Sequence, residues 1–115
     1  MSTEPGRRIF EIRTYTTEAG KLEALHRRFR LHTMRLFAKH GMVSVGYWVP
    51  QENGGRDTLV YILSHSSREA AERSWEAFRN DPEWQRVKAE SEAEGRIVSR
   101  IESRFLEPTD YSPLQ

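Results

Sequence analysis

The chain has 115 residues, with 18 basic and 17 acidic side chains and a formal net charge of +1. This length suits one domain with a single core, and the balanced charge lacks the strong basic excess of a nucleic-acid-binding protein. Cysteine is absent, which excludes disulfide bridges and thiolate zinc sites.

The chain begins with MSTEPGRR, which lacks the apolar segment of a signal peptide. No apolar run approaches the roughly 20 residues that a membrane span requires. The mean hydropathy of -0.77 is low for a protein with a buried core, and it favours helices with long charged faces. We therefore expect a cytoplasmic protein with no membrane span and no nucleic-acid partner.

The first half of the chain predicts a strand followed by a long helix. Residues 1–7 are predicted to be a flexible or extended leader, and residues 8–15 alternate as a β-strand does. A helix is predicted over residues 21–40, because apolar side chains recur there at helical spacing. These side chains are Leu22, Leu25, Phe29 and Leu36. Gly41 follows directly and is the expected left-handed residue at a helix end.

The second half predicts a hairpin, a broken helix and a last strand. The strands 42–49 and 58–65 flank QENGGRD, whose Asn-Gly-Gly is the strongest hairpin signal in the chain. Ser66 or Ser67 can cap the next helix. Asp81 and Pro82 should interrupt this helix, as N-cap and first-turn residue of a new one. The expected inward-facing residues are Ala71, Trp75, Phe78, Trp84 and Val87. The last strand covers residues 96–106, and the tail 109–115 is predicted to be flexible or extended.

The predicted order β-α-β-β-α-β is that of a ferredoxin-like α+β domain, which we place at residues 8–108. In this fold the helices cover one face of a four-stranded antiparallel sheet. The other face is amphipathic here, with apolar and charged residues along the same strands. Such a face suits a sheet that packs on the sheet of a second copy, so we expect a homodimer.

The first strand contains FEIRTYT, whose two faces differ in character. One face carries Glu11, Arg13 and Tyr15, and the other carries Phe10, Ile12 and Thr14. We expect the Phe10 side to be the core face beneath the helices. Arg13 should then lie on the face turned away from the helices. There the partner subunit would remove it from water, and a carboxylate of Glu11 or Glu102 would meet it.

Several segments together resemble the NIPSNAP family of the dimeric α+β-barrel superfamily, over about Ile9 to Pro108. These are FEIRTYT, EAGKLEALHRRF, KHGM, VGYW, NDPEWQ and IESRFLEP. EIRTY followed by DPEW at this separation is the most specific part. The resemblance implies a ferredoxin-like protomer whose sheet packs against a partner's sheet to form a barrel. Related barrels include cofactor-free monooxygenases and small-molecule isomerases.

The candidate ligand-binding residues are Glu11, Arg13, Tyr15, Tyr61, His65, Arg100 and Glu102. A guanidinium fork and a phenol can together bind an anion or a carbonyl oxygen. The alternative is that these charges pair only with one another. We therefore expect a homodimer that binds a small organic molecule. A cofactor-free monooxygenase or isomerase, or a non-catalytic scaffolding dimer, are the alternatives.

The four histidines do not form a metal motif, since neither HxxxH nor HExxH occurs. We expect no metal and no cofactor. His65 lies on the same strand face as Tyr61 and is the best histidine for a pocket, whereas His32 should lie at the edge of the core. The basic cluster HRRFR at residues 26–30 is predicted to be a solvated helix face.

Overall fold

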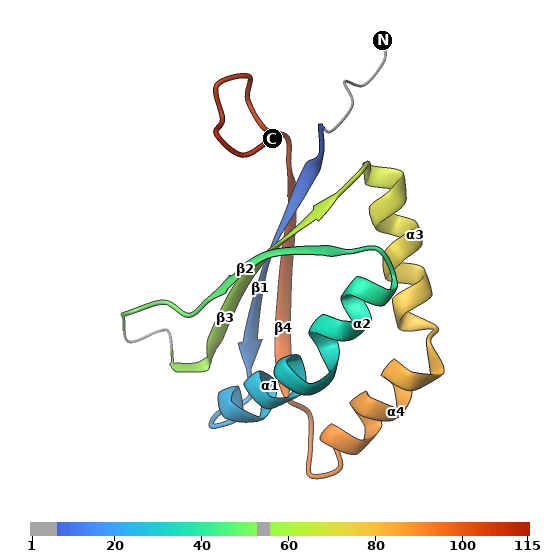
Figure 1. Cartoon of the computed structure of the whole chain (residues 1–115). Coiled ribbons are helices and arrows are strands. Elements are labelled where there is room, and N and C mark those ends of the chain that lie inside the picture. Colours follow the sequence, from blue (N-terminus) through green and yellow to red (C-terminus); the bar gives the residue numbers. More distant parts are fainter. Residues whose placement is uncertain (1–6, 53–55) are drawn as a thin grey trace.

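The computed structural model describes residues 7–52 and 56–115, which form a single sheet covered by helices (Figure 1). The elements in chain order are β1 (Ile9–Thr17), α1 (Leu22–Arg28), η1 (Phe29–Thr33), α2 (Met34–Lys39), β2 (Val43–Trp48), β3 (Thr58–His65), α3 (Arg68–Arg79), α4 (Pro82–Ser91) and β4 (Val98–Leu106). The Asn-Gly-Gly turn and, apart from Arg7, the leader predicted over residues 1–7 lie outside the described residues.

The sheet has four strands in the order β2-β3-β1-β4, and every neighbouring pair is antiparallel. The helices lie together on one face of it (Figure 1). This confirms the predicted ferredoxin-like α+β fold. The order also places β1 between β3 and β4, so β1 is the strand through which side chains from the whole sheet can meet.

The predicted helix over residues 21–40 forms α1, η1 and α2, which follow one another without a break. The middle segment, η1, is π-helical, and the Thr33 hydroxyl donates a hydrogen bond to the Arg28 carbonyl oxygen at 3.3 Å. Such π-helical turns often occur at functional sites. Gly41 ends the segment with φ of 83°, the left-handed conformation that its position predicts.

The break between α3 and α4 also follows the prediction. The Ser67 hydroxyl accepts a hydrogen bond from the Ala70 N–H at 3.0 Å and caps α3. The Asp81 carboxylate accepts from the Glu83 N–H at 2.8 Å and caps α4, whose first residue is Pro82. The break lets the two helices cover different parts of the sheet.

The prediction for the two faces of β1 was wrong. Tyr15, with 8% of its surface exposed, belongs to the core cluster beneath the helices, and Glu11 is 1% exposed. Arg13 lies opposite Tyr61 of β3, so both side chains point to the helices. The face of β1 that lies beneath the helices is determined by its pairing with a distant strand. Leu59, Tyr61 and Leu63 form the buried face of β3, and their partners on β1 are Tyr15, Arg13 and Glu11.

The open face of the sheet carries the row that we had assigned to the core. Ile12 lies between Ile62 of β3 and Arg104 of β4, and Thr14 lies between Val60 and Glu102. Trp48 of β2 is 51% exposed. Its ring covers Gly46, where an added Cβ would lie only 2.5 Å from a ring carbon. The open face is therefore apolar in its centre and charged along β4.

Candidate functional site

Glu11 is the centre of a buried polar network. Its Oε1 accepts hydrogen bonds from His65 Nε2 at 2.9 Å and Trp75 Nε1 at 2.8 Å. Its Oε2 accepts from Arg13 Nη1 at 2.9 Å and Ser103 Oγ at 2.7 Å. Burial by itself raises the pKa of this carboxyl, but these hydrogen bonds outweigh burial and lower the pKa from 4.5 to about 2. The carboxylate thus joins β1 to β3, β4 and α3.

Arg13 extends this network towards two phenols. Its Nε donates to the Tyr61 hydroxyl at 2.8 Å, and its Nη2 donates to the Tyr15 hydroxyl at 3.2 Å. The guanidinium lies 4.1 Å from the centre of the Trp75 ring, beneath α3. Burial lowers the pKa of Arg13, but the two phenols and Glu11 more than offset this effect and raise it. Arg13 is therefore a permanent cation that meets Glu11, as predicted, but α3 of its own chain covers it, so the prediction that a partner subunit removes it from water was wrong.

The hydrogen bonds among Arg13, Tyr15 and Tyr61 leave one phenol proton without an acceptor. Both hydroxyl oxygens receive an N–H of Arg13, and they lie 2.8 Å apart, with Tyr61 donating to Tyr15. Only one proton can lie between two oxygens. The Tyr15 proton therefore has no acceptor among the described residues. Tyr61 is fully buried, and burial raises its pKa well above the ordinary value, so it stays protonated.

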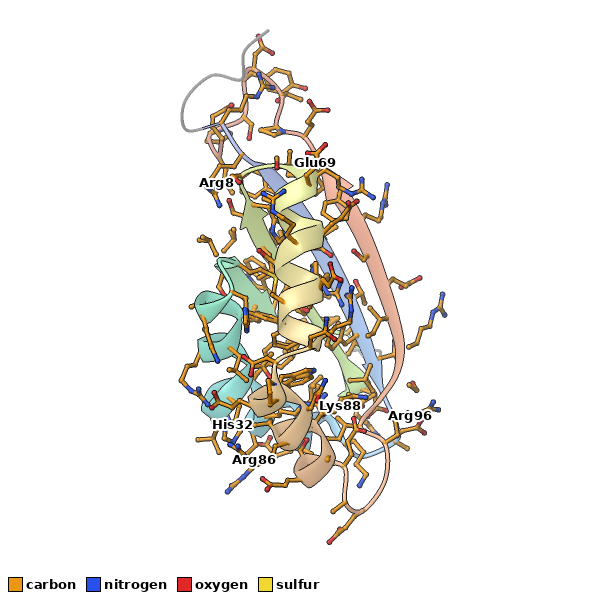
Figure 2. The ribbon with its side chains drawn as sticks, turned by 90° about the vertical axis from the view of Figure 1, so that its right-hand side faces the viewer. Arg8, His32, Glu69, Arg86, Lys88 and Arg96 are labelled. Atoms are coloured by element: carbon orange, nitrogen blue, oxygen red, sulfur yellow. The ribbon has the colours of Figure 1, made fainter. Side chains whose placement is uncertain are left out.

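Tyr15 borders a cleft of about 300 Å³ between the sheet and the helices. The helices contribute an aromatic wall, which consists of Phe29, Phe37, Phe78 and Trp84. The opposite wall is the first half of β4, residues 98–101. Figure 2 shows Lys88 on α4 and Arg96 beside the start of β4, and both residues line the cleft. Apolar walls with a few polar groups are typical of small-molecule sites.

Arg28 is a residue of this cleft that the sequence analysis missed. Its side chain is 5% exposed, and its Nη1 donates to Glu92 at 3.2 Å and to the Ser91 hydroxyl at 3.1 Å. Its Nε is buried and has no hydrogen-bond partner among the described residues. The prediction that residues 26–30 form a solvated face was therefore wrong at this position. The signal was available, because Arg28 lies three residues after the core residue Leu25, on the same helical face.

The structure brings five of the seven predicted site residues together and leaves two apart. The five are Glu11, Arg13, Tyr15, Tyr61 and His65. Arg100 and Glu102 pair with each other at 2.8 Å on exposed β4 and do not join the network, although Arg100 also borders the cleft. His32 is half-buried at the helix surface, near Arg35.

The chain offers no preformed metal site within residues 7–52 and 56–115, where no group of three or more His, Asp or Glu side chains could hold an ion. None of the helices there is long and apolar enough to cross a membrane.

The sequence profile of the NIPSNAP family matches residues 10–113. The chain belongs to the NIPSNAP family. A NIPSNAP family protein of unknown function from Agrobacterium tumefaciens has a similar structure, with a TM-score of 0.81 and 22% identity over 100% of both chains. A second NIPSNAP family protein from that organism has a TM-score of 0.78 and 25% identity, over 100% of this chain and 97% of the other.

A more distant similarity is to SnoaB, a cofactor-independent oxygenase from Streptomyces nogalater. The TM-score is 0.62 at 16% identity, over 94% of the NIPSNAP chain and 99% of SnoaB. At this identity the similarity shows the fold alone. No curated protein sequence matches the chain.

Proposed function

We propose that this NIPSNAP protein is a cytoplasmic homodimer whose protomers bind a small organic molecule in the cleft beside Tyr15. The observation that carries the proposal is Tyr15, which lines an aromatic cleft and whose hydroxyl proton lacks an acceptor among the described residues. A buried donor without a partner is costly, and a ligand oxygen would satisfy it. The absence of cysteine is compatible with a reducing compartment.

The network behind Tyr15 supports a binding role, since it fixes the phenol in place. Arg13 holds the hydroxyls of Tyr15 and Tyr61, and Glu11 holds Arg13 through a 2.9 Å ion pair. Each of these groups is anchored to a strand rather than to a loop. A donor fixed in this way loses little entropy when a ligand binds. Glu11, Arg13 and Tyr61 therefore position Tyr15 and need not touch the ligand.

A thermal-shift screen of small aromatic acids and ketones tests ligand binding. Compounds that bind should raise the melting temperature of the wild-type chain in proportion to their concentration. The matched variant is Ile101→Trp, because Ile101 borders the cleft and is 51% exposed, so a larger side chain can fill the cleft at little cost in stability. The compounds should not stabilise this variant. A screen without hits, or equal shifts in both proteins, contradicts the proposal.

The open sheet face supports the homodimer. Val43 and Trp48 are about half exposed on β2, and Leu106 is 41% exposed on β4. Apolar side chains in such numbers on one sheet face mark an interaction surface. Light scattering should give a mass twice the 13.5 kDa of one chain. Trp48→Lys should give the mass of one chain, and a monomeric wild-type protein would refute the dimer.

Oxygenase or isomerase chemistry in the same cleft is the second candidate. It is favoured by the similarity to SnoaB, together with a phenol donor at the cleft wall. The test measures oxygen consumption with an oxygen electrode, with hydroquinones as substrates. An oxygenase consumes oxygen in the wild-type protein and loses this activity in Tyr15→Phe, whereas an isomerase, a non-catalytic binding protein or a scaffold consumes none.

A further inference from the structure

We infer that the ligand of this cleft is a monoanionic aromatic compound whose anionic oxygen accepts a hydrogen bond from Arg28 Nε. This inference rests on the proposed binding function and adds the chemical class of the ligand. Arg28 carries it because its side chain is buried and borders the cleft, yet one of its donors has no partner within residues 7–52 and 56–115.

The unpaired donor is unusual for a buried arginine. The Nη1 atom of Arg28 already meets Glu92 and Ser91, and the guanidinium lies 5.2 Å from the centre of the Trp84 ring. Nε is thus the one atom of this side chain that is buried without an acceptor. Nearly all buried polar groups of proteins have a hydrogen-bond partner, and an exception needs an explanation. Arg28 borders the cleft, and a turn of its buried side chain would bring Nε within reach of an oxygen of a molecule bound there.

The charges around the cleft indicate one negative charge on that molecule. The cations of the lining are Arg28, Lys88, Arg96 and Arg100. Three of them are paired, as Arg28–Glu92 at 3.2 Å, Arg96–Glu18 at 3.0 Å and Arg100–Glu102 at 2.8 Å. Lys88 makes no ion pair with any described residue. One positive charge therefore remains at the cleft, which a carboxylate or an enolate would neutralise.

The walls indicate the rest of the ligand. Phe78 and Trp84 lie with ring centres 4.6 Å apart and an interplanar angle of 31°, so the two rings stack on each other in the aromatic wall. A planar ring system packs well against aromatic side chains. A cleft of about 300 Å³ is at the small end of ligand sites, and it suits one or two fused rings.

The test uses two probes that differ in charge and little in shape, naphthoate and acetonaphthone. Isothermal titration calorimetry measures the affinity of each for the wild-type protein and for three variants. Arg28→Met removes the buried donor, Lys88→Gln removes the unpaired charge, and Glu92→Gln removes the carboxylate that competes for Arg28. Arg86→Gln is the matched control for Lys88→Gln, because Arg86 is an exposed cation of α4 outside the cleft (Figure 2).

Naphthoate should bind the wild-type protein more tightly than acetonaphthone does. Its affinity should fall about tenfold in Arg28→Met and about threefold in Lys88→Gln. In Glu92→Gln its affinity should rise about threefold, while the affinity of acetonaphthone changes little. Arg86→Gln should leave both probes unaffected. The Glu92 variant keeps the inference testable if Arg28→Met does not fold, since a rise cannot come from unfolding.

Three results would overturn the inference, and they differ in what they imply for the proposed function. If both probes bind with equal affinity, and Arg28→Met and Lys88→Gln leave both affinities unchanged, the cleft binds ligands but does not select anions. If naphthoate affinity falls in Glu92→Gln, the carboxylate helps binding and the charge assignment is wrong. If neither probe binds the wild-type protein, the inference and the proposed function fail together.

Discussion

Replacing Glu11 by glutamine should lower the free energy of unfolding, because it removes a buried carboxylate. The carboxylate accepts four hydrogen bonds, from His65, Trp75, Arg13 and Ser103. A glutamine side chain has only one acceptor oxygen, and its NH₂ group would face two donors. The pKa of Glu11 lies at about 2 instead of 4.5. At about 1.4 kcal/mol per pKa unit, this difference corresponds to about 3 kcal/mol of folding free energy.

The lowered pKa of Glu11 predicts how the free energy of unfolding changes with pH. Because folding lowers the pKa of Glu11, its contribution is fully present above about pH 5 and is lost as the pH falls towards about 2. Urea unfolding at neutral pH should show a free energy of unfolding about 3 kcal/mol lower in Glu11→Gln. The two proteins should approach each other in stability as the pH falls, because the wild-type carboxyl then becomes protonated.

The control for this experiment is Glu72→Gln, which removes an exposed carboxylate of α3, away from the open sheet face, and should change stability by less than about 0.5 kcal/mol. All samples need one protein concentration, since the proposed dimer would gain stability with concentration. A loss below about 1 kcal/mol in Glu11→Gln at neutral pH would refute the reasoning. A difference between the proteins that stays constant down to about pH 2 would also refute it.

Three further variants test the fold. Trp84→Ala should lower the free energy of unfolding by about 3 kcal/mol, because its ring packs on Phe78, and an unchanged urea midpoint would contradict this packing. Asp81→Ala removes the cap of α4 and the acceptor of His40, so the melting temperature should fall by about 4 °C or more; an equal melting temperature would contradict the capping role. Gly41→Ala should cost about 1 kcal/mol, because Gly41 has a positive φ, and a gain in stability would argue against that conformation.

The elements of this fold could be predicted because their signals are local. The cap residues Ser67 and Asp81, and Gly41 at the helix end, each act on the backbone of their own neighbours. The strand over residues 58–65 was predicted with the bounds that the structure gives it. Such signals are present in a few consecutive residues, so a single sequence is enough to find them.

The site could be predicted only in part, because its geometry depends on contacts between distant residues. Alternation grouped Glu11, Arg13 and Tyr15 correctly, but it could not say which side of the sheet they face. That choice follows from the pairing of Arg13 with Tyr61, 48 residues away. The helical spacing from Leu25 indicated that Arg28 lies on a buried helix face, but its place beside the cleft depends on contacts with Glu92 and Trp84 near α4.

A crystal structure of the protein grown with naphthoate tests the central claim most directly, because it shows where a bound molecule lies. We expect density for the probe in the cleft between α4 and β4, with its rings on Trp84 and its carboxylate within hydrogen-bond distance of Arg28 or Tyr15. Density on the open sheet face alone, or an unchanged cleft at a probe concentration that saturates the protein in solution, would contradict the claim that this cleft is the ligand site.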